Sequence, residues 1–308
     1  MKALITGING FVGHYLSKYL LEQGYAVCGT VIEDNVNIEN VNIYKMNILN
    51  KNEVEETIRK IDPDFIYHLA GQSAVGLSWE NPTLTIDVNV NGTINLLDAV
   101  RENDLNTKVL IIGSSDQYGI IKPEDCPISE EHELNPSSPY AISKTTQEQI
   151  AKLYIKAYNM NIIMVRAFNH IGPMQSKNFV VSDFASKVAE IENGAEPIIR
   201  VGNLEAYRDF TDVRDIVRGY TMLMEKGKIG EVYNIGSGNA YKIQDILNIL
   251  LSLSTKEIKV EIDKEKLRPS DVPIVQCDNS KIKSHINWSI QYDIKNTLKD
   301  TLDYWRNM

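Results

Sequence analysis

Short apolar runs alternate with amphipathic stretches through the first half of the chain. Runs rich in β-branched residues predict buried strands at residues 2–6, 25–31, 65–69, 109–114 and 161–168. Apolar residues at helical spacing predict helices between them, at residues 10–23, 54–61, 93–100 and 140–157. This alternation is typical of right-handed βαβ units, so we predict an α/β fold with a doubly wound, Rossmann-like parallel sheet covered on both faces. Ligands of such sheets bind at the carboxyl ends of the strands.

The pattern loosens beyond about residue 169, where Pro, Gly and Asn become frequent. Helices are predicted there at 243–253 and 294–305, a strand at 258–262, and a late strand of the main sheet at 230–236. We therefore expect a large domain made of residues 1–168 and about 205–236. The remaining segments, 169–204 and 237–308, are expected to form a smaller domain over the edge of the sheet.

Composition and charge narrow the class of protein. Hydrophobic residues make up 43% and charged residues 24% of the 308, which is ordinary for a globular chain. The net charge of −9 argues against nucleic acid or an acidic membrane as a partner. No stretch approaches the roughly 18 apolar residues of a membrane span, and the first residues lack a signal-peptide pattern. Cys28, Cys126 and Cys277 have neither disulfide nor zinc spacing, so we expect a reduced, cytoplasmic protein with no metal site.

Three glycines stand between the first predicted strand and the first predicted helix. Gly7, Gly10 and Gly13 have the spacing G-x-x-G-x-x-G, one residue longer than the common dinucleotide fingerprint. Such glycines allow a tight turn, close approach of a diphosphate to the backbone, and close packing of helix on strand. The position of the loop favours a dinucleotide site that also includes Phe11 and Val12.

The residues after the second strand leave the choice between NAD and NADP open. An acid at the end of this strand favours NAD, and an arginine favours NADP. Here Glu33 and Asp34 follow slightly late, after Ile32, so neither signature is clean.

A tyrosine and a lysine share one face of the predicted helix 140–157. Tyr140 and Lys144 are four residues apart, and Ser114 ends a predicted strand, where active sites of such sheets are built. Tyrosine, with a usual pKa near 10, is a weak proton donor or acceptor at neutral pH unless a cation stabilises its phenolate. These residues suit the reduction of a carbonyl group, with Ser114 binding the substrate oxygen.

The glycine loop and the Ser–Tyr–Lys set resemble the extended short-chain dehydrogenase/reductase family of nucleotide-sugar dehydratases, epimerases and reductases. The run His68-Leu69-Ala70-Gly71 is similar to the family's HLAA segment, and residues 89–93 are similar to its N-V-x-G-T. The resemblance covers essentially the whole chain and implies NADP or NAD as cofactor, with NADPH slightly favoured. Beyond the loop glycines, Tyr140 and Lys144, the cofactor contacts it implies are Asn47, Ile48, Leu69, Ala70, Gly71 and Asn89.

Motifs in the second half narrow the resemblance to enzymes of GDP-mannose-derived sugars. The runs RAFNHIGP (166–173), VGNLEAYRDFTDV (201–213) and LRPS (267–270) are similar to segments of that subfamily. Arginine forks suit the binding of a diphosphate, which agrees with a GDP-sugar as the small-molecule partner. The substrate contacts that the resemblance implies are Gln72, Ser73, Ser115, Asn169, Val201, Arg208 and Arg268.

Two activities compete within this subfamily, together with a nucleotide-sugar 4-epimerase. A GDP-mannose 4,6-dehydratase carries a glutamate two positions after the serine or threonine, and Asp116 stands there in this chain. Its side chain is one methylene shorter, and a misplacement of about an ångström can cost about 10²-fold in rate. We therefore favour reduction of the C4 keto group of GDP-4-dehydro-6-deoxy-D-mannose, with the C4 configuration of the product open. A binding protein on a dehydrogenase scaffold is disfavoured, because such proteins usually lose the Tyr/Lys pair.

The resemblance also implies a homodimer. In this family the helices expected at 91–102 and 140–157 pack with their copies into a four-helix interface. Apolar residues on these helices could supply it, although packing inside one subunit explains part of the same pattern.

Overall fold

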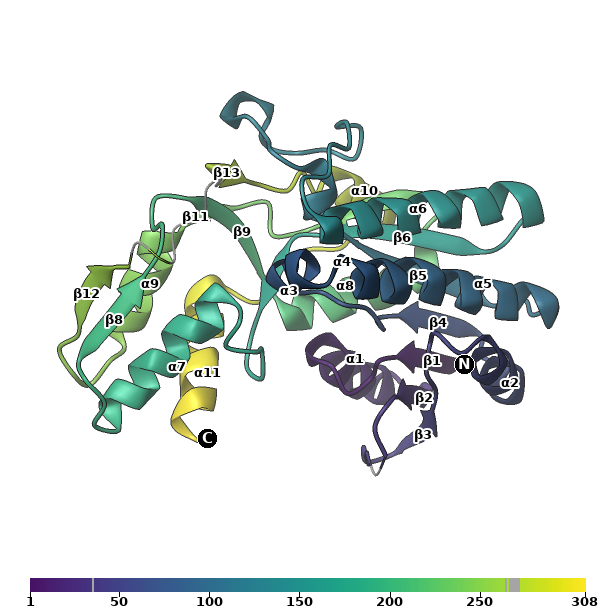
Figure 1. The fold of residues 1–308 in the computed structure, drawn as a ribbon, viewed down its shortest axis with the longest axis horizontal. Helices are drawn as coiled ribbons and strands as arrows, with labels where there is room; N and C mark the ends of the chain where they lie inside the picture. The colour runs from purple at the N-terminus through teal and green to yellow at the C-terminus, as the bar shows by residue number, and fades with distance from the viewer. Residues whose placement is uncertain (35, 264, 266–271) are drawn as a thin grey trace.

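The computed structural model describes residues 1–34, 36–263, 265 and 272–308 (Figure 1). In this part of the chain, seven parallel strands form one sheet in the order β10-β6-β5-β4-β1-β2-β3. Their bounds are β1 Lys2–Thr6, β2 Ala26–Val31, β3 Val41–Lys45, β4 Phe65–His68, β5 Lys108–Ser114, β6 Ile162–Ala167 and β10 Val232–Ile235. The strand order reverses at β1, whose neighbours are β2 and β4. The crevice of a doubly wound sheet opens at this switch point.

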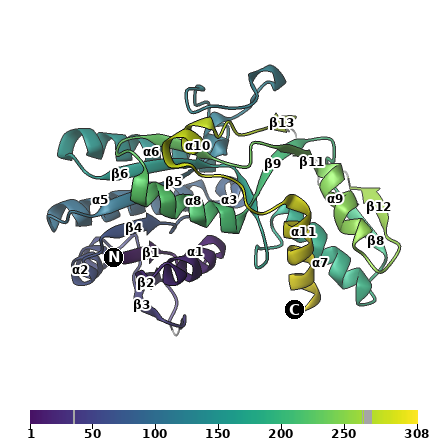
Figure 2. The same cartoon turned by 180° about the vertical axis from the view of Figure 1, so that it is seen from behind.

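Helices cover both faces of the sheet. Along β1, Ala3 and Ile5 pack into the core beneath α1 (Phe11–Glu22), α8 (Val213–Lys226) and α10 (Ser280–Ile286). Leu4 points to the other face, into the core beneath α2 (Lys51–Ile61), α5 (Gly92–Glu102) and α6 (Pro139–Tyr158). Figure 1 views the sheet from the side of α5 and α6, and Figure 2 from the side of α8 and α10. The predicted doubly wound fold is confirmed.

The predicted strands and helices of the first half are present, with ends displaced by a few residues. Strand β3 was not predicted, because it is a partly exposed edge strand without a continuous apolar run. Also unpredicted are the short helices that precede α5: α3 (Val75–Glu80), α4 (Pro82–Ile86) and the π-helix η1 (Asp87–Asn91). The short 3₁₀ helices η2 (Ser115–Tyr118) and η3 (Pro123–Asp125) follow β5.

A second core lies beside the large sheet. Phe184, Leu247 and Leu298 are among its buried residues. Strands β8 (Ile198–Val201) and β12 (Lys259–Ile262) pair in parallel. The helices around them are α7 (Val180–Glu192), α9 (Ile243–Ser252) and α11 (Ile294–Arg306). The sequence predicted α9, β12 and α11 but not α7 or β8.

A small sheet lies between the large sheet and this second core. Strand β9 (Tyr207–Asp212) pairs with β7 (Asn169–Ile171), β11 (Ala240–Lys242) and β13 (Ile274–Val275), although residues from about 205 were expected in the large domain. Conversely, Trp288 and helix α10 join the core of the large sheet, although the sequence assigned them to the smaller domain. The two-domain division itself stays a prediction.

Two surface features bear on partners. Among the described residues, no helix is both long and apolar enough to cross a bilayer. On α6, Ile142 is 48% and Leu153 55% exposed, which leaves apolar surface on one of the helices expected at a dimer interface. The association of two copies stays a prediction.

Candidate active site

The glycine loop lies at the carboxyl end of β1. Gly7 has φ +67°, and a Cβ there would lie 3.0 Å from the Cα of Ala70. A Cβ on Gly13 would overlap the carbonyl oxygen of Ile8, so helix α1 packs closely against the backbone of the loop here. Gly10 precedes α1, and no side chain caps this helix start. The first backbone N–H groups of α1 are therefore suited to binding a diphosphate, and the residues of the glycine loop fit a dinucleotide.

The HLAG run passes next to the glycine loop. The backbone N–H of Ala70 donates to Thr6 Oγ1 over 3.0 Å. A Cβ on Gly71 would lie 3.0 Å from Asn89 Oδ1 and 3.7 Å from Lys144 Nζ, so this backbone lies against the lysine. The run therefore joins the predicted cofactor loop to the predicted catalytic residues.

Asn89 holds the chain after this run in place. Its Oδ1 accepts from the backbone N–H of Gln72 over 2.8 Å, and its Nδ2 donates to the Gln72 carbonyl and to Ser143 Oγ. The amide is thus engaged with protein, and its contact with the cofactor stays a prediction. Gln72 donates from Nε2 to the Ala74 carbonyl, while its Oε1 is buried without a partner in the described structure. Ser73 is exposed.

Tyr140 and Lys144 are buried in the first turns of α6. Only 8% of Tyr140 and 7% of Lys144 is exposed, so they are not a surface pair. Ser138 caps the helix by accepting from the backbone N–H of Ala141 over 3.1 Å, which fixes the start of α6. The Tyr140 hydroxyl lies beside Ser114, whose side chain acts to lower the pKa of the phenol. Burial raises the pKa of Tyr140 and the charge of Asp116 raises it further, so the phenol is protonated at neutral pH.

Lys144 has two protein acceptors. Its Nζ donates to the Ile112 carbonyl over 2.8 Å and to Gln147 Oε1 over 3.0 Å. An ammonium group has three donors, so one is left for a ligand. Burial lowers the pKa of Lys144 to about 8, because the charged form is poorly solvated there.

Behind Lys144, a buried chain of hydrogen bonds runs back to the end of β1. Gln147 Nε2 donates to Thr93 Oγ1 over 2.7 Å, and Thr93 in turn donates to the Asn89 carbonyl. Since the Thr93 proton is used, His68 Nε2 must donate to Thr93 Oγ1, at 3.0 Å. The Nδ1 of His68 then accepts from Thr6 Oγ1 at 2.9 Å. Burial lowers the pKa of His68 to about 3, so this imidazole is neutral.

The sequence did not single out Gln147 or Thr93. One signal could have found Gln147: it lies three residues after Lys144, on the same face of the helix. The position of Thr93 depends on packing between α5, α6 and β4.

The loop that carries Ser114 is anchored by a buried ion pair. Gln117 Oε1 accepts from the backbone N–H of Ser114, and its Nε2 donates to Glu148, both over 2.8 Å. Arg166 donates to both oxygens of the Glu148 carboxylate, over 2.9 and 2.8 Å. Burial acts to raise the pKa of Glu148, but the hydrogen bonds and charge of Arg166 lower it to about 2. Asp116 is exposed on this loop, and Ser115 is buried.

The predicted substrate residues are only partly brought together. Asn169 is exposed in β7, and Arg208 lies on the adjacent β9, where its Nη1 donates to the Tyr207 and Val272 carbonyls. Val201 is 1% exposed in the core around β8, so its side chain does not reach these residues. Arg268 lies outside the described residues.

Two of the residues expected to contact the cofactor, Asn47 and Ile48, lie after β3. Asn47 is exposed, and its Oδ1 accepts from the backbone N–H of Leu49 over 3.0 Å. Ile48 is 4% exposed and lies against Gly92 at the start of α5.

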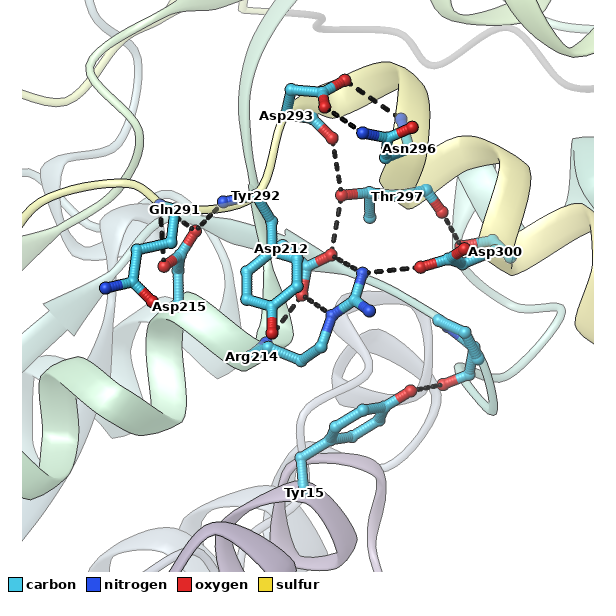
Figure 3. Close-up of polar contacts among 12 residues, drawn as sticks. Tyr15, Asp212, Arg214, Asp215, Gln291, Tyr292, Asp293, Asn296, Thr297 and Asp300 are labelled. Carbon is cyan, nitrogen blue, oxygen red and sulfur yellow. Dashed lines mark hydrogen bonds and ion pairs between the residues drawn. The ribbon is translucent and has the colours of Figure 1, made fainter.

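A polar cluster fastens the C-terminal helix to this region (Figure 3). The buried Asp212 carboxylate accepts from Arg214, over 2.9 and 2.7 Å, and from Thr297 Oγ1 over 2.7 Å. Arg214 also pairs with Asp300 at 2.8 Å and stacks on the ring of Tyr292. This cluster holds α11 against the start of α8.

Helix α1 contacts the RAFNHIGP run directly. The Phe11 ring lies parallel to His170, with centroids 6.1 Å apart, and Tyr15 donates to the Pro173 carbonyl over 3.1 Å. The predicted dinucleotide loop and the run that carries the predicted substrate contact Asn169 are therefore neighbours.

Fold and site together define an extended short-chain dehydrogenase/reductase, an NAD(P)-dependent oxidoreductase. A doubly wound sheet carries the glycine loop at its switch point, with Ser114 and the buried Tyr140 and Lys144 nearby. More narrowly, the chain belongs to the family described as GDP-mannose 4,6 dehydratase, whose sequence profile matches residues 4–301.

Three known proteins illustrate the similarity. The GDP-6-deoxy-D-mannose reductase of Pseudomonas aeruginosa is 28% identical over 99% of this chain and 97% of its own length. GDP-mannose 4,6 dehydratase 2 of Arabidopsis thaliana is 31% identical over 98% of this chain and 86% of its own length. A structure of RMD from P. aeruginosa complexed with NADPH superposes with a TM-score of 0.88, at 28% identity and 99% coverage of both chains.

These comparisons confirm the predicted family and its nucleotide-sugar dehydratase/reductase chemistry. Solved structures of this fold hold NADPH in the RMD of P. aeruginosa and NAD in a UDP-glucose 4-epimerase of Thermus thermophilus.

Proposed function

We propose that the chain reduces the C4 keto group of GDP-4-dehydro-6-deoxy-D-mannose, giving GDP-D-rhamnose or its C4 epimer. The observation that carries this proposal is the buried, protonated Tyr140, which lies beside Ser114, the last residue of β5. Reduction needs a proton donor at the keto oxygen, and this pair supplies one. The match to the P. aeruginosa reductase over nearly the full length of both chains supports the same choice.

A bound nicotinamide supplies the hydride that adds to C4. Tyr140 donates its phenolic proton to the C4 oxygen, and the Ser114 hydroxyl hydrogen-bonds that oxygen and orients it. When Tyr140 has given up its proton, Lys144 stabilises the resulting phenolate. Hydrogen bonds to Ile112 and Gln147 hold Lys144 one helical turn from Tyr140. Its third donor is available to the nicotinamide ribose. Solvent then returns a proton to Tyr140.

The remaining predicted residues bind the two ligands. Gly7, Gly10 and Gly13 would hold the cofactor diphosphate, and Gly71 would lie beside the ribose near Lys144. Gln72 and Ser73 are assigned to the sugar, because they follow Gly71, which lies next to Lys144. The substrate diphosphate is assigned to Asn169 and Arg208, together with Arg268 on the strength of its sequence motif.

The dehydratase is the second candidate, and Asp116 favours it. Its charge raises the pKa of Tyr140, which supports a carboxylate close to the proposed proton donor. A dehydratase needs such a base to remove the C5 proton before water leaves from C6. The shorter aspartate is what makes us favour the reductase.

One assay separates the two. Purified protein is mixed with GDP-4-dehydro-6-deoxymannose or with GDP-mannose, and with NADH or NADPH, while nicotinamide absorbance is followed and products are resolved by mass. Consumption of reduced cofactor with a gain of two hydrogens, on the keto sugar alone, is the expected result. Loss of water from GDP-mannose without net consumption of cofactor would identify a dehydratase instead.

Tyr140→Phe tests the assigned proton donor. We expect turnover to fall by far more than about tenfold, because general acid catalysis contributes about 10²–10⁴-fold. Cofactor affinity should stay nearly unchanged, as measured by titration. Tyr158→Phe, on the exposed end of the same helix, is the matched control. A Tyr140→Phe protein that keeps more than a tenth of the rate would show that another group donates the proton.

A further inference from the structure

The connection after β2 carries three acids and no basic residue. It reads IEDNVNIEN over residues 32–40. Glu33 is exposed, and its Oε2 accepts from Asn9 Nδ2 over 2.9 Å. Asn9 lies inside the glycine loop, between Gly7 and Gly10. The carboxylate is thereby held against the loop, although it comes later in the sequence than the usual acid.

The backbone brings these segments together as well. The N–H of Ile8 donates to the Thr30 carbonyl over 3.2 Å, so the glycine loop is tied to the last residues of β2. Thr6 and Thr30 are register partners on β1 and β2. In a doubly wound fold, the end of the second strand lies beside the adenosine ribose of a dinucleotide on this loop. Glu33 therefore stands where the ribose 2′ position is read.

The basic residue of the neighbouring strand β3 is already paired. Lys45, the last residue of β3, has its Nζ 2.9 Å from Asp34 Oδ2. A ribose 2′-phosphate would have to compete with Asp34 for this exposed lysine while facing the charge of Glu33. A 2′-hydroxyl, in contrast, can donate to the Glu33 carboxylate, which only accepts hydrogen bonds.

We propose that Glu33 binds the 2′-hydroxyl of the adenosine ribose, excludes the 2′-phosphate, and makes NADH the coenzyme of this chain. The proposal rests on the proposed function, which places the dinucleotide over the glycine loop. It differs from the NADPH-bound P. aeruginosa structure and from the slight preference for NADPH that the resemblance implied. Asn9 acts as a positioning residue, because it orients the carboxylate by donating to one of its oxygens.

Binding measured without turnover tests the proposal. NADH and NADPH are titrated separately into the protein, and nicotinamide fluorescence gives each Kd. We expect NADH to bind at least about tenfold tighter than NADPH, a difference of about 1.4 kcal/mol. Glu33→Gln should narrow this ratio by strengthening NADPH binding, and Glu33→Arg should invert it, because a guanidinium attracts the phosphate. Asn9→Ala should weaken NADH binding more than NADPH binding.

Glu39→Gln is the matched control, since it removes the same charge from an exposed residue of the same connection. It should leave the ratio unchanged. Tighter binding of NADPH to the unaltered protein, or a ratio that Glu33→Gln does not change, would overturn the assignment of Glu33.

Turnover keeps this proposal distinct from the proposed function. If NADPH binds more tightly and is consumed with the keto sugar, the reductase stands and the coenzyme assignment is wrong. If NADH binds more tightly but neither coenzyme is consumed with that sugar, the coenzyme assignment stands and the reductase is wrong. If neither coenzyme binds, both proposals are wrong.

Discussion

The buried charge of Lys144 lowers the free energy of unfolding, and replacing this residue should show by how much. Burial lowers its pKa from 10.5 to about 8. One pKa unit corresponds to about 1.4 kcal/mol, so protonated Lys144 destabilises the ligand-free protein by about 3 kcal/mol at pH 7. Lys144→Met removes this charge. It also leaves the Ile112 carbonyl and Gln147 Oε1 without their donor, which costs about 1 kcal/mol each and does not depend on pH.

The pH dependence of stability separates the effect of removing the charge from the effect of losing the two hydrogen bonds. Between pH 8 and 10.5 the unfolded chain holds a proton on Lys144 that the folded chain has released, so the contribution of Lys144 to the stability of the unaltered protein rises with pH. The variant lacks this contribution, so the difference in stability between the two proteins changes over this range. We therefore expect Lys144→Met to be more stable by about 1 kcal/mol at pH 7 and less stable by about 2 kcal/mol above pH 10.

Urea unfolding of the ligand-free proteins across this pH range measures the difference. Lys156→Met, which replaces an exposed lysine on the same helix, is the control, and its difference should be nearly constant. A difference for Lys144→Met that also stays constant with pH would refute the argument that burial lowers this pKa.

Two further substitutions probe the supports of the site. Glu148→Gln leaves Arg166 buried without its counter-charge, so unfolding free energy should fall by about 3–5 kcal/mol in urea titrations at pH 7; a loss below about 1 kcal/mol would contradict the role of this pair. Gly7→Ala places a Cβ 3.0 Å from the Cα of Ala70 at φ +67°, so dinucleotide affinity should fall by about tenfold or more in fluorescence titrations. Gly76→Ala, where a Cβ meets no atom within 4 Å, is its control and should bind as the unaltered protein does.

The strands that carry the site could be predicted from the sequence because they are buried on both faces. Strands β1, β4, β5 and β6 are continuous apolar runs, and parallel sheets require this. Strand β3 alternates and lies at the edge, so its pattern is weak. Helix α8 contains Gly219, which normally interrupts a helix; here a Cβ would lie 2.5 Å from Ile235 Cδ1, so glycine allows close packing on β10.

The residues that hydrogen-bond the reactive side chains were harder to predict from the sequence than the reactive side chains themselves. Ser114, Tyr140 and Lys144 follow from spacing and strand ends, but a hydrogen-bond partner depends on which elements meet in space. Gln147 reaches Thr93 only because α5 and α6 pack together, and Gln117 reaches Glu148 for the same kind of reason. Glu33 comes later in the sequence than the acid that usually ends the second strand. Its contact with Asn9 depends on the path of the chain after β2, which the sequence does not specify.

The buried hydrogen-bond chain from Lys144 to Thr6 has one further consequence, for the charge at the site. His68 is neutral down to about pH 3, and Gln147, Thr93 and Thr6 carry no charge, so Lys144 is the charged member of this chain. The groups behind Lys144 therefore hold its ammonium group in place without neutralising it, and its positive charge is left to act on the ligands of the site.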